Sequence, residues 1–479
     1  MISKPQHIHP IALVFFLYDS LKQLVFPALI IFFGIVNAEN EKWLIIFSVL
    51  LISFIIIKTF LGYFMFTYQL SNDEIFIKSG IFVKKLNHIP YERIQNITSN
   101  QWFFLKPFKL EELKIETAGQ SDKPEVSLKA VPDSLRPKIA NLRNHQEHSK
   151  SKQASENSYH ISFRDLIKFS LTSTAIINAL IVAFALFGKI HDFIDERELK
   201  TIADKVINLQ IVLMILLPIA IFFVFYLLLS FILFSKYYDF KLTEAKGHLE
   251  TMRGLFKTRK TNINLNRVQA ILIKQNFLKR LFSIATVQLV IVSNSTEDDT
   301  EENVIIMPVI NYEKVTDFLN QFFPNIPVEE TSHFNPLTAT YFYKFRNATI
   351  GMAITIGLIV LLLHRFVLLT TILSILGLLI WYLPAYLSAK RSNIQFLNDK
   401  YLQLQNNHLL TKQIALIPKA SLQFTKKSQS LWLKRKNIAN IALNIRSGVS
   451  QKTFAVTYQA ENDIDSIMRW YKKTTNNQN

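Results

Sequence analysis

IPYERIQNI, the stretch at Ile89–Ile97, returns as INLNRVQAI at Ile263–Ile271 and as IPKASLQFT at Ile417–Thr425. A glutamine keeps its place in the three copies: Gln95, Gln269 and Gln423. Self-similarity at a long spacing is the signature of a repeated structural unit. We therefore interpret the 479-residue chain as three related repeats.

Downstream of the motif, the three repeats continue alike. A second glutamine follows, and it opens the stretches QWFFLKPF, QNFLKRLF and QSLWLKRK: Gln101, Gln275 and Gln429. Alternating apolar residues come next, and period two predicts half-buried strands. Each repeat then ends in a short stretch with helical spacing. The pattern predicts a strongly bent sheet that is closed by one C-terminal amphipathic helix.

Upstream of each motif lie two apolar segments. The six segments are Leu24–Val36, Trp43–Phe66, Phe169–Gly188, Ile211–Phe234, Asn347–Leu363 and Phe366–Ala389. A bilayer core of about 30 Å is spanned by about 20 helical residues, so the first and fifth are short. One helix through the last two segments would measure about 60 Å, so we expect a break there. The sequence predicts six transmembrane helices in three hairpins.

Composition agrees with a membrane protein. Hydrophobic residues make up 49% of the chain and charged residues 19%. The formal net charge of +18 indicates an anionic neighbour, and the spans favour a membrane surface over nucleic acid. The absence of cysteine excludes disulfides, cysteine-ligated zinc or iron–sulfur clusters, and a cysteine nucleophile.

Basic residues beside the spans predict the orientation. They flank the side that carries the repeats: Lys22, Lys168, Lys236, Arg346, Lys390 and Arg391. The opposite side has an acid-rich loop at Ile190–Val206. Lys and Arg accumulate on the cytoplasmic side, so we expect a multi-pass protein of the bacterial plasma membrane with both termini and all three domains in the cytoplasm.

The expected fold class is an α+β membrane protein, in which each transmembrane hairpin is followed by a bent-sheet domain with a C-terminal helix. The expected boundaries are 1–66 for the N-terminal segment and hairpin 1, 67–150 for domain 1, 160–234 for hairpin 2, 235–330 for domain 2, 335–389 for hairpin 3 and 390–479 for domain 3.

The motif I-P-x-x-R-I-Q at Ile89–Gln95, followed by L-K-I-E-T-A-G at Leu113–Gly119, resembles the bacterial PH-like, membrane-flanked domain family. The whole chain is similar to its three-domain, YdbT-like members. Repeat 2 departs from the pattern at Val292–Asn294, and repeat 3 has Ser421 where the arginine is expected. The resemblance implies PH-like barrels, no enzymatic activity, and a smaller family member as a protein partner.

Repeat 3 carries the clearest candidate surface. Two basic clusters surround an aromatic residue: Lys426, Lys427, Trp432, Lys434, Arg435 and Lys436. Near an anionic leaflet each basic residue contributes about 1 kcal/mol of attraction. Tryptophan also concentrates at the headgroup level. These residues predict a contact to anionic lipid, although solvated charge that enforces topology would look the same.

The motif residues have two readings. Arg93 and Arg267 could bind a phosphate or a carboxylate, or could hold a turn through backbone carbonyls, which we favour because the position recurs with the backbone. Ser421 at the third position shows that any shared role does not require arginine. We interpret the three motif glutamines as structural too.

The sequence gives little support for a transport residue, a metal site or a catalytic site. Lys58 inside the second span is a functional candidate by default, yet it lies near enough to the domain side to snorkel. The acidic run Glu297–Glu302 lacks the spacing and glycine of a calcium loop. Nucleotide, hydrolase and kinase motifs are absent from the sequence. We therefore expect no catalytic residues, metal or cofactor.

Three functions remain open. The favoured one is a non-enzymatic scaffold that docks protein partners or anionic headgroups, in envelope maintenance or stress defence. The alternative is a lipid-handling or transport protein that uses the six helices, and the third is an enzyme acting on lipid headgroups. Nearly apolar spans disfavour a transporter, and the lack of clustered acids or histidines disfavours the enzyme.

Overall fold

The computed structural model describes residues 4–36, 41–81, 83–117, 126–146, 157–173, 176, 178–183, 209–245, 247–291, 303–327, 337–363, 367–447 and 450–475. The chain forms two compact units. Unit 1 comprises Met1–Ser155, His248–Ile263 and Ser293–Asp298, and unit 2 comprises Glu156–Gly247, Asn264–Val292 and Asp299–Asn479. The part of repeat 2 that runs from His248 to Ile263 thus belongs to unit 1.

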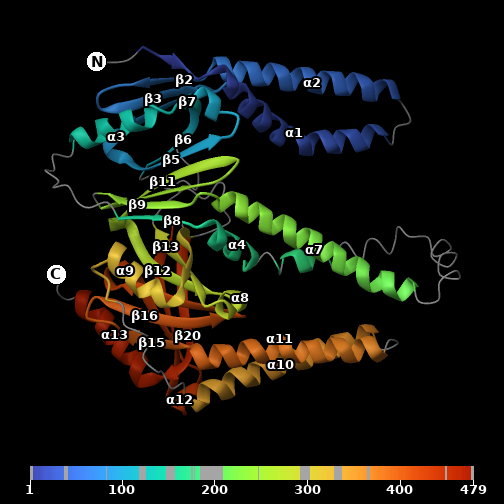
Figure 1. Ribbon diagram of the computed structural model, residues 1–479, viewed down its shortest axis with the longest axis vertical. Coiled ribbons are helices and arrows are strands. Elements are labelled where there is room, and N and C mark those ends of the chain that lie inside the picture. The colour runs from blue at the N-terminus through green and yellow to red at the C-terminus, as the bar shows by residue number, and fades with distance from the viewer. Residues whose placement is uncertain are drawn as a thin grey trace. The chain divides into compact units, whose positions relative to one another are not determined.

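Unit 1 begins with a helical hairpin of α1 (Leu13–Val36) and α2 (Glu41–Phe64) (Figure 1). Helix α1 starts well before the predicted span at Leu24, since its first turns carry apolar residues on either side of Asp19 and Lys22. The hydroxyl of Tyr63 donates to the Ile8 carbonyl at 3.1 Å and ties the hairpin to the N-terminal segment.

Two sheets follow in unit 1. The first has the order β1 (Gln6–His7), β2 (Thr67–Leu70), β3 (Glu74–Ser79) and β4 (Lys85–Pro90). The second contains β7 (Val126–Pro132), β6 (Leu110–Thr117), β5 (Ile94–Trp102), β11 (Lys257–Asn264) and β10 (His248–Arg253), in that order. Apolar side chains of β2 to β7 share one buried core with Ile139 of helix α3 (Leu135–Gln146). The predicted C-terminal helix is present, but the predicted single bent sheet is in this structure two sheets around one core.

Two tight turns of unit 1 require glycine. Gly80 and Gly254 occupy equivalent repeat positions and have φ values of +102° and +116°. A Cβ at Gly254 would lie 2.1 Å from the carbonyl oxygen of Lys257, and one at Gly80 would lie 2.0 Å from that of Val83. Only a residue without Cβ fits there. The turns fix the hairpins β3–β4 and β10–β11.

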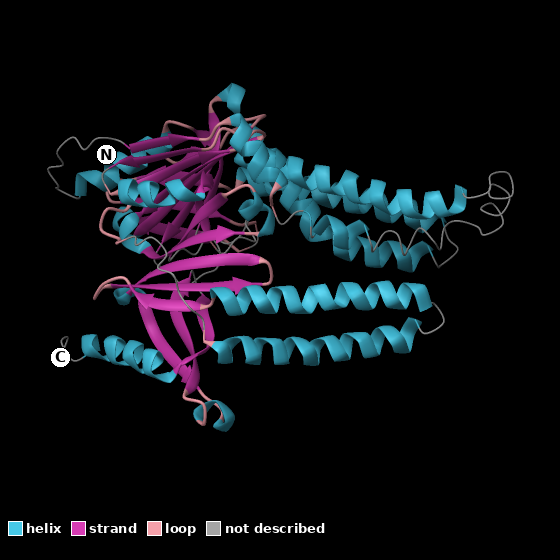
Figure 2. Cartoon of the chain, turned by 60° about the horizontal axis from the view of Figure 1, so that its bottom comes forward, coloured by secondary structure: helices cyan, strands magenta, loops and turns pink. Residues whose placement is uncertain are grey.

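Unit 2 contains the remaining long helices, α7 (Leu209–Tyr237), α10 (Thr338–Leu363) and α11 (Val367–Arg391), and the shorter α4 (Phe163–Leu171). Helices α10 and α11 run side by side away from the strands (Figures 1 and 2). They are separate helices, as the predicted break requires. Helix α10 starts earlier than the predicted span at Asn347.

Across the described residues, five helices are long and apolar enough to cross a membrane: Pro10–Leu29, Ile45–Phe64, Ile219–Tyr237, Thr338–Leu361 and Leu373–Arg391. The six predicted spans are therefore not all confirmed. The predicted third span, Phe169–Gly188, lies partly outside the described residues, and the loop Ile190–Val206 used for the orientation lies wholly outside them.

The strands of unit 2 form three groups. Strand β8 (Asn157–His160) pairs with β9 (Lys241–Ala245). A six-stranded sheet has the order β14 (Val304–Asn311), β13 (Ile284–Ile291), β12 (Val268–Gln275), β17 (Thr411–Pro418), β16 (Tyr401–His408) and β15 (Asn393–Phe396). The last sheet consists of β18 (Leu422–Ser428), β19 (Ile438–Ser447) and β20 (Ser450–Ala460). Helices α9 (Val315–Phe322) and α13 (Glu461–Thr475) end repeats 2 and 3, as their apolar spacing predicted.

Candidate docking and membrane-contact surfaces

The second glutamine of each repeat holds the loop that follows it. Its side-chain amide donates to a backbone carbonyl nine residues further on in all three repeats: Gln101 to Leu110 at 3.2 Å, Gln275 to Ile284 at 3.0 Å and Gln429 to Ile438 at 2.9 Å. The residue before that carbonyl has a positive φ each time: Lys109, Ser283 and Asn437. The three loops, 102–109, 276–283 and 430–437, therefore end in the same way, and we name them the apolar loops.

Each apolar loop exposes large apolar side chains. Phe103 is 60% exposed, Phe277 52%, Leu431 81% and Trp432 71%. Loop 2 forms a short helix, α8 (Phe277–Leu281), and loop 3 forms α12 (Leu431–Lys434). Exposed apolar residues grouped on a soluble surface commonly mark a membrane or protein contact.

The apolar loops pack against the helix or the helix end that precedes each domain. In repeat 1 the Phe104 ring lies 5.8 Å from the Phe15 ring of α1. In repeat 2 the Asn276 side chain donates to the carbonyl of Thr172, which directly follows α4. In repeat 3 Leu433 shares a buried cluster with Tyr343 of α10. The loops thus lie where each domain meets the helix that precedes it in these contacts.

Loop 3 carries most of the predicted basic residues. Lys434, Arg435 and Lys436 are exposed, and the Arg435 guanidinium lies 5.5 Å from the centre of the Trp432 ring. Lys426 is exposed on β18. The structure therefore brings a tryptophan and three cations together on one loop.

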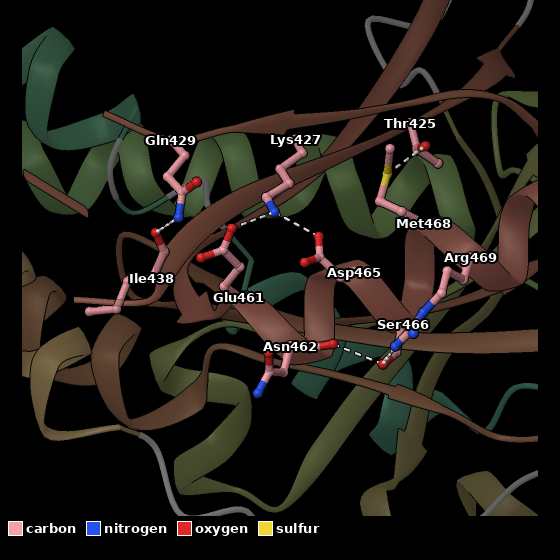
Figure 3. A network of polar contacts seen from close by, with 10 residues as sticks. All are labelled: Thr425, Lys427, Gln429, Ile438, Glu461, Asn462, Asp465, Ser466, Met468 and Arg469. Atoms are coloured by element: carbon pink, nitrogen blue, oxygen red, sulfur yellow. Dashed lines mark hydrogen bonds and ion pairs between the residues drawn. The ribbon is translucent and has the colours of Figure 1, made fainter. Parts of the chain in front are cut away.

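Lys427 has a different setting from its neighbours. Its ammonium lies 2.8 Å from Glu461 Oε1 and 2.6 Å from Asp465 Oδ1, both on α13 (Figure 3). Hydrogen bonds to Asp465 and Glu461 raise the pKa of Lys427, and the bond from Lys427 lowers the pKa of Glu461. This lysine fastens α13 to β18, so its charge is already paired within the domain.

The first motif positions lie at one recurring turn. Arg93, Arg267 and Ser421 end the 3₁₀ turns Tyr91–Arg93, Leu265–Arg267 and Lys419–Ser421. Arg93 is exposed, Arg267 is half-buried, and Ser421 is buried. The placement agrees with a position that recurs with the backbone.

The motif glutamines begin the strand after that turn. The Gln269 side chain makes a long contact of 3.4 Å to the Arg267 carbonyl, and the exposed Gln423 accepts a bond from the Tyr471 hydroxyl at its backbone oxygen. Gln95 lies in β5, and its side chain is outside the described structure, as are the acidic run Glu297–Glu302 and the end of the motif at Gly119. Lys58 donates to Gln23 of α1 at 2.8 Å.

Consecutive repeats are joined by strand pairing. In unit 1, β5 of repeat 1 pairs antiparallel with β11 of repeat 2, and Gln101 lies opposite Thr258. In unit 2, β12 of repeat 2 pairs antiparallel with β17 of repeat 3, and Gln275 lies opposite Lys412. Counted from Arg93, Arg267 and Ser421, the two pairings have the same register. The join is thus a repeated structural element.

The two joins differ in chemistry. Strand β11 brings basic residues to repeat 1, where Lys257 lies 4.7 Å from the centre of the Trp102 ring. Strand β6 beside β5 supplies the buried Glu111, Glu112 and Glu116. The join in unit 2 is apolar, because Leu272 of β12 and Ala415 of β17 are fully buried in one core.

In repeat 3, the strand equivalent to β5 and β12 is β18, and it is not paired with a described strand of a further repeat. Among the described strands, β18 pairs only with β19, so its other edge is open. Strand β4 of repeat 1 is likewise the last strand of its sheet. An open edge offers unpaired backbone groups to an added strand.

Sequence reasoning did not foresee the joins. The second glutamines were visible in the sequence, but their bond to a carbonyl nine residues on is a property of the folded loop. Strand pairing between repeats leaves no short-range signal, because the paired strands are far apart in the chain.

Comparison with known proteins agrees with these repeats. The family described as "Bacterial PH domain" matches residues 24–148 and 184–323. The chain is 25% identical to the UPF0699 transmembrane protein YdbT of Bacillus subtilis, over 98% of this chain and 99% of that protein. The resemblance read from the motifs is confirmed.

Proposed function

Because the chain belongs to the bacterial PH domain family, we propose that it is a non-enzymatic membrane protein that docks a further PH-like domain on the open edge of β18. The docked domain continues the series of strand pairings that joins the three repeats. The observation that carries the proposal is the repeated join, β5 with β11 and β12 with β17, and the open equivalent strand in repeat 3.

The register of the joins specifies how the docked strand pairs. Transferred to β18, it places Lys426 opposite the residue equivalent to Asn87, and Lys427 opposite the residue equivalent to Leu86. In this chain those residues lie on β4, which is the last described strand of its own sheet. Like charges directly opposite each other would oppose pairing, and neither of these two pairs has them. The occupant is therefore a second copy or a smaller family member with an equivalent strand.

A cysteine pair tests the docking, since the chain has no native cysteine. Lys426→Cys and Asn87→Cys in one chain should give a disulfide-linked ladder in native membranes if a second copy is bound. Gln451→Cys with Asn87→Cys is the matched control, because Gln451 is exposed on β20, at the far edge of the same sheet. The control pair should remain monomeric.

A photo-reactive residue at position 426 tests whether the occupant is a smaller family member and not a second copy. A smaller family member should then be cross-linked in place of a second copy, and its cross-linked peptide should come from a strand followed by an I-P-x-x-R turn. Absence of both products, with Lys426→Cys fully reactive to a soluble maleimide in native membranes, would contradict the docking proposal.

A second function is favoured by the apolar loops. Their exposed Phe103, Phe277 and Trp432, beside the hairpin ends, support shallow insertion into the cytoplasmic leaflet, with Lys434–Lys436 at anionic headgroups. The cytoplasmic placement rests on the basic residues that flank the domain side. Nitroxide labels on single cysteines at positions 103, 277 and 432 should be more accessible to dissolved oxygen than to a water-soluble nickel complex. A label at the exposed Asn398, in the turn between β15 and β16, should show the reverse.

A further inference from the structure

Three turns between strands carry apolar residues at their tips. Residues 81–83 lie between β3 and β4, residues 255–256 between β10 and β11, and residues 409–410 between β16 and β17, and we name them the β-hairpin tips. Val83 is 72% exposed, Phe256 52% and Leu409 62%. Turns of this kind usually consist of glycine, asparagine or aspartate, which suit both the backbone and water. Large exposed apolar side chains at the same place in each repeat therefore indicate a contact.

The join between repeats 1 and 2 sets one β-hairpin tip beside an apolar loop. The Phe103 amide donates to the Phe256 carbonyl at 2.7 Å, so the pairing of β5 with β11 continues into the loop and the tip. The Phe104 ring contacts the Phe15 ring of α1, and Phe15 lies about 8 Å from the start of the apolar span Pro10–Leu29 at 1.5 Å per residue. Two exposed phenylalanines from different repeats are thus neighbours near the domain end of a span.

The join between repeats 2 and 3 has the same arrangement. Two residues beyond its last pair, the register sets Phe277 of the second apolar loop opposite Leu410. Thr411, which follows this tip, lines one cavity together with Leu233 of α7. Leu233 lies about 6 Å from the end of the apolar span Ile219–Tyr237 at 1.5 Å per residue. The second tip is therefore also beside an apolar loop and near the end of a span.

The neighbouring spans indicate that the contact is with lipid. A span ends where the hydrocarbon core meets the headgroups, and exposed apolar side chains at that level can enter the acyl region, which is favourable because they leave water. The two tips also differ in sequence, as Leu255–Phe256 and Leu409–Leu410. A protein partner would have to recognise two different apolar pairs beside two different loops. Acyl chains require only that the side chains are apolar.

We propose that each join between repeats builds one membrane-contact surface from two parts, the apolar loop of one repeat and the β-hairpin tip of the next, and that tips 255–256 and 409–410 insert into the leaflet on the domain side. The proposal deepens the membrane contact of the apolar loops and rests on it. The register of the joins then has a membrane role, because a shift of two residues would move a tip about 7 Å from its loop. Tip 81–83 precedes β4, the last described strand of its sheet, and belongs to neither join.

The test places one nitroxide label at a time on the full chain in phosphatidylglycerol nanodiscs, since the chain has no native cysteine. Labels at Phe256→Cys and Leu409→Cys should be more accessible to dissolved oxygen than to a water-soluble nickel complex, like the loop labels at positions 103 and 277. A label at Lys400→Cys is the matched control and should show the reverse. Lys400 is exposed, and the eight residues of β16, about 26 Å at 3.3 Å per residue, separate it from Leu409.

The outcomes separate this proposal from the one on which it rests. Loop labels in lipid together with tip labels in water would overturn the role of the tips and leave the contact of the apolar loops standing. Loop and tip labels all in water would contradict the membrane contact itself. Low access of both reagents to labels 256 and 409 would mean that protein covers the tips, which also overturns the proposal.

A second measurement needs no label on a tip. Leu409→Ser should shift a label at position 277 toward water, because the tip and the loop form one surface. Phe396→Ser is the control, since Phe396 is 41% exposed and ends β15 beside the turn at the other end of β16. It should leave the label at position 277 unchanged. An equal shift in both variants, or no shift in Leu409→Ser, would show that the tip and the loop do not act together.

Discussion

The Gln275 side chain donates to the carbonyl oxygen of Ile284 at 3.0 Å, and Gln275 is 5% exposed. Equivalent bonds occur in repeats 1 and 3 with the same spacing. The glutamine amide supplies this carbonyl, at the first residue of the following strand, with a side-chain donor. The bond ties the two ends of the apolar loop together.

Gln275→Leu should therefore loosen the second apolar loop. A buried carbonyl without its donor costs about 1–3 kcal/mol. Amide hydrogen exchange over the loop and the start of β13 should accelerate about tenfold or more in the detergent-solubilised chain. The control Gln269→Leu removes only the long 3.4 Å contact, so its exchange should stay close to that of the wild type. Equal acceleration in both variants would show that the bond does not hold the loop.

The sequence predicted the repeats, the strand alternation and the closing helices, because each depends on local periodicity. It placed the starts of α1 and α10 too late, since Tyr18, Asp19 and Arg346 reduced the apolar signal although the helix continues through them. It grouped Lys427 with the exposed lysines. Its pairing with Glu461 and Asp465 depends on α13 packing beside β18, which charge counting does not reveal.

Gly254→Ala should disrupt the first join between repeats. The added Cβ would lie 2.1 Å from a backbone oxygen, and the φ of +116° is strained for any L side chain. We expect the β10–β11 hairpin and its pairing with β5 to lose protection from hydrogen exchange. Gly247→Ala is the matched control, because its φ is also positive, at +78°, but nothing lies within 4 Å of the added Cβ. It should cost only about 1–2 kcal/mol.

Glu111 makes the stability of unit 1 depend on pH. Burial raises the pKa of this carboxyl above its usual 4.5, against the opposing effect of the Ser99 hydrogen bond. The protonated form is favoured in the fold, so this stabilisation is complete below pH 4.5 and is lost as pH rises through the raised pKa.

Glu111→Gln should consequently raise the melting temperature at pH 7.5 and leave it nearly unchanged at pH 4.5, measured by thermal unfolding in detergent. Glu92→Gln at an exposed position should change neither value. A melting temperature that falls at pH 7.5 in the Glu111 variant would mean that its charge is stabilising, contrary to the burial argument.

Experiments should show that Lys427 has a structural role and that the cations of loop 3 have a role at the surface. Lys427→Gln should increase hydrogen exchange in α13. The lowered pKa of Glu461 means that the paired state gives stability above pH 4.5, and this stability is lost as pH falls through the lowered value. Acid should therefore loosen α13 in the wild type and have little further effect in the variant.

Charge reversal at Lys434, Arg435 and Lys436 should act differently, because these side chains are exposed. Protection of α13 should be unchanged, while a nitroxide label at Trp432→Cys should move toward water in anionic nanodiscs. Added salt should have the same effect as the reversal, since exposed charges are screened within about 10 Å at 0.1 M. If the reversal leaves the label depth unchanged and Lys427→Gln alters it, the membrane contact runs through β18 and α13 instead of the apolar loop.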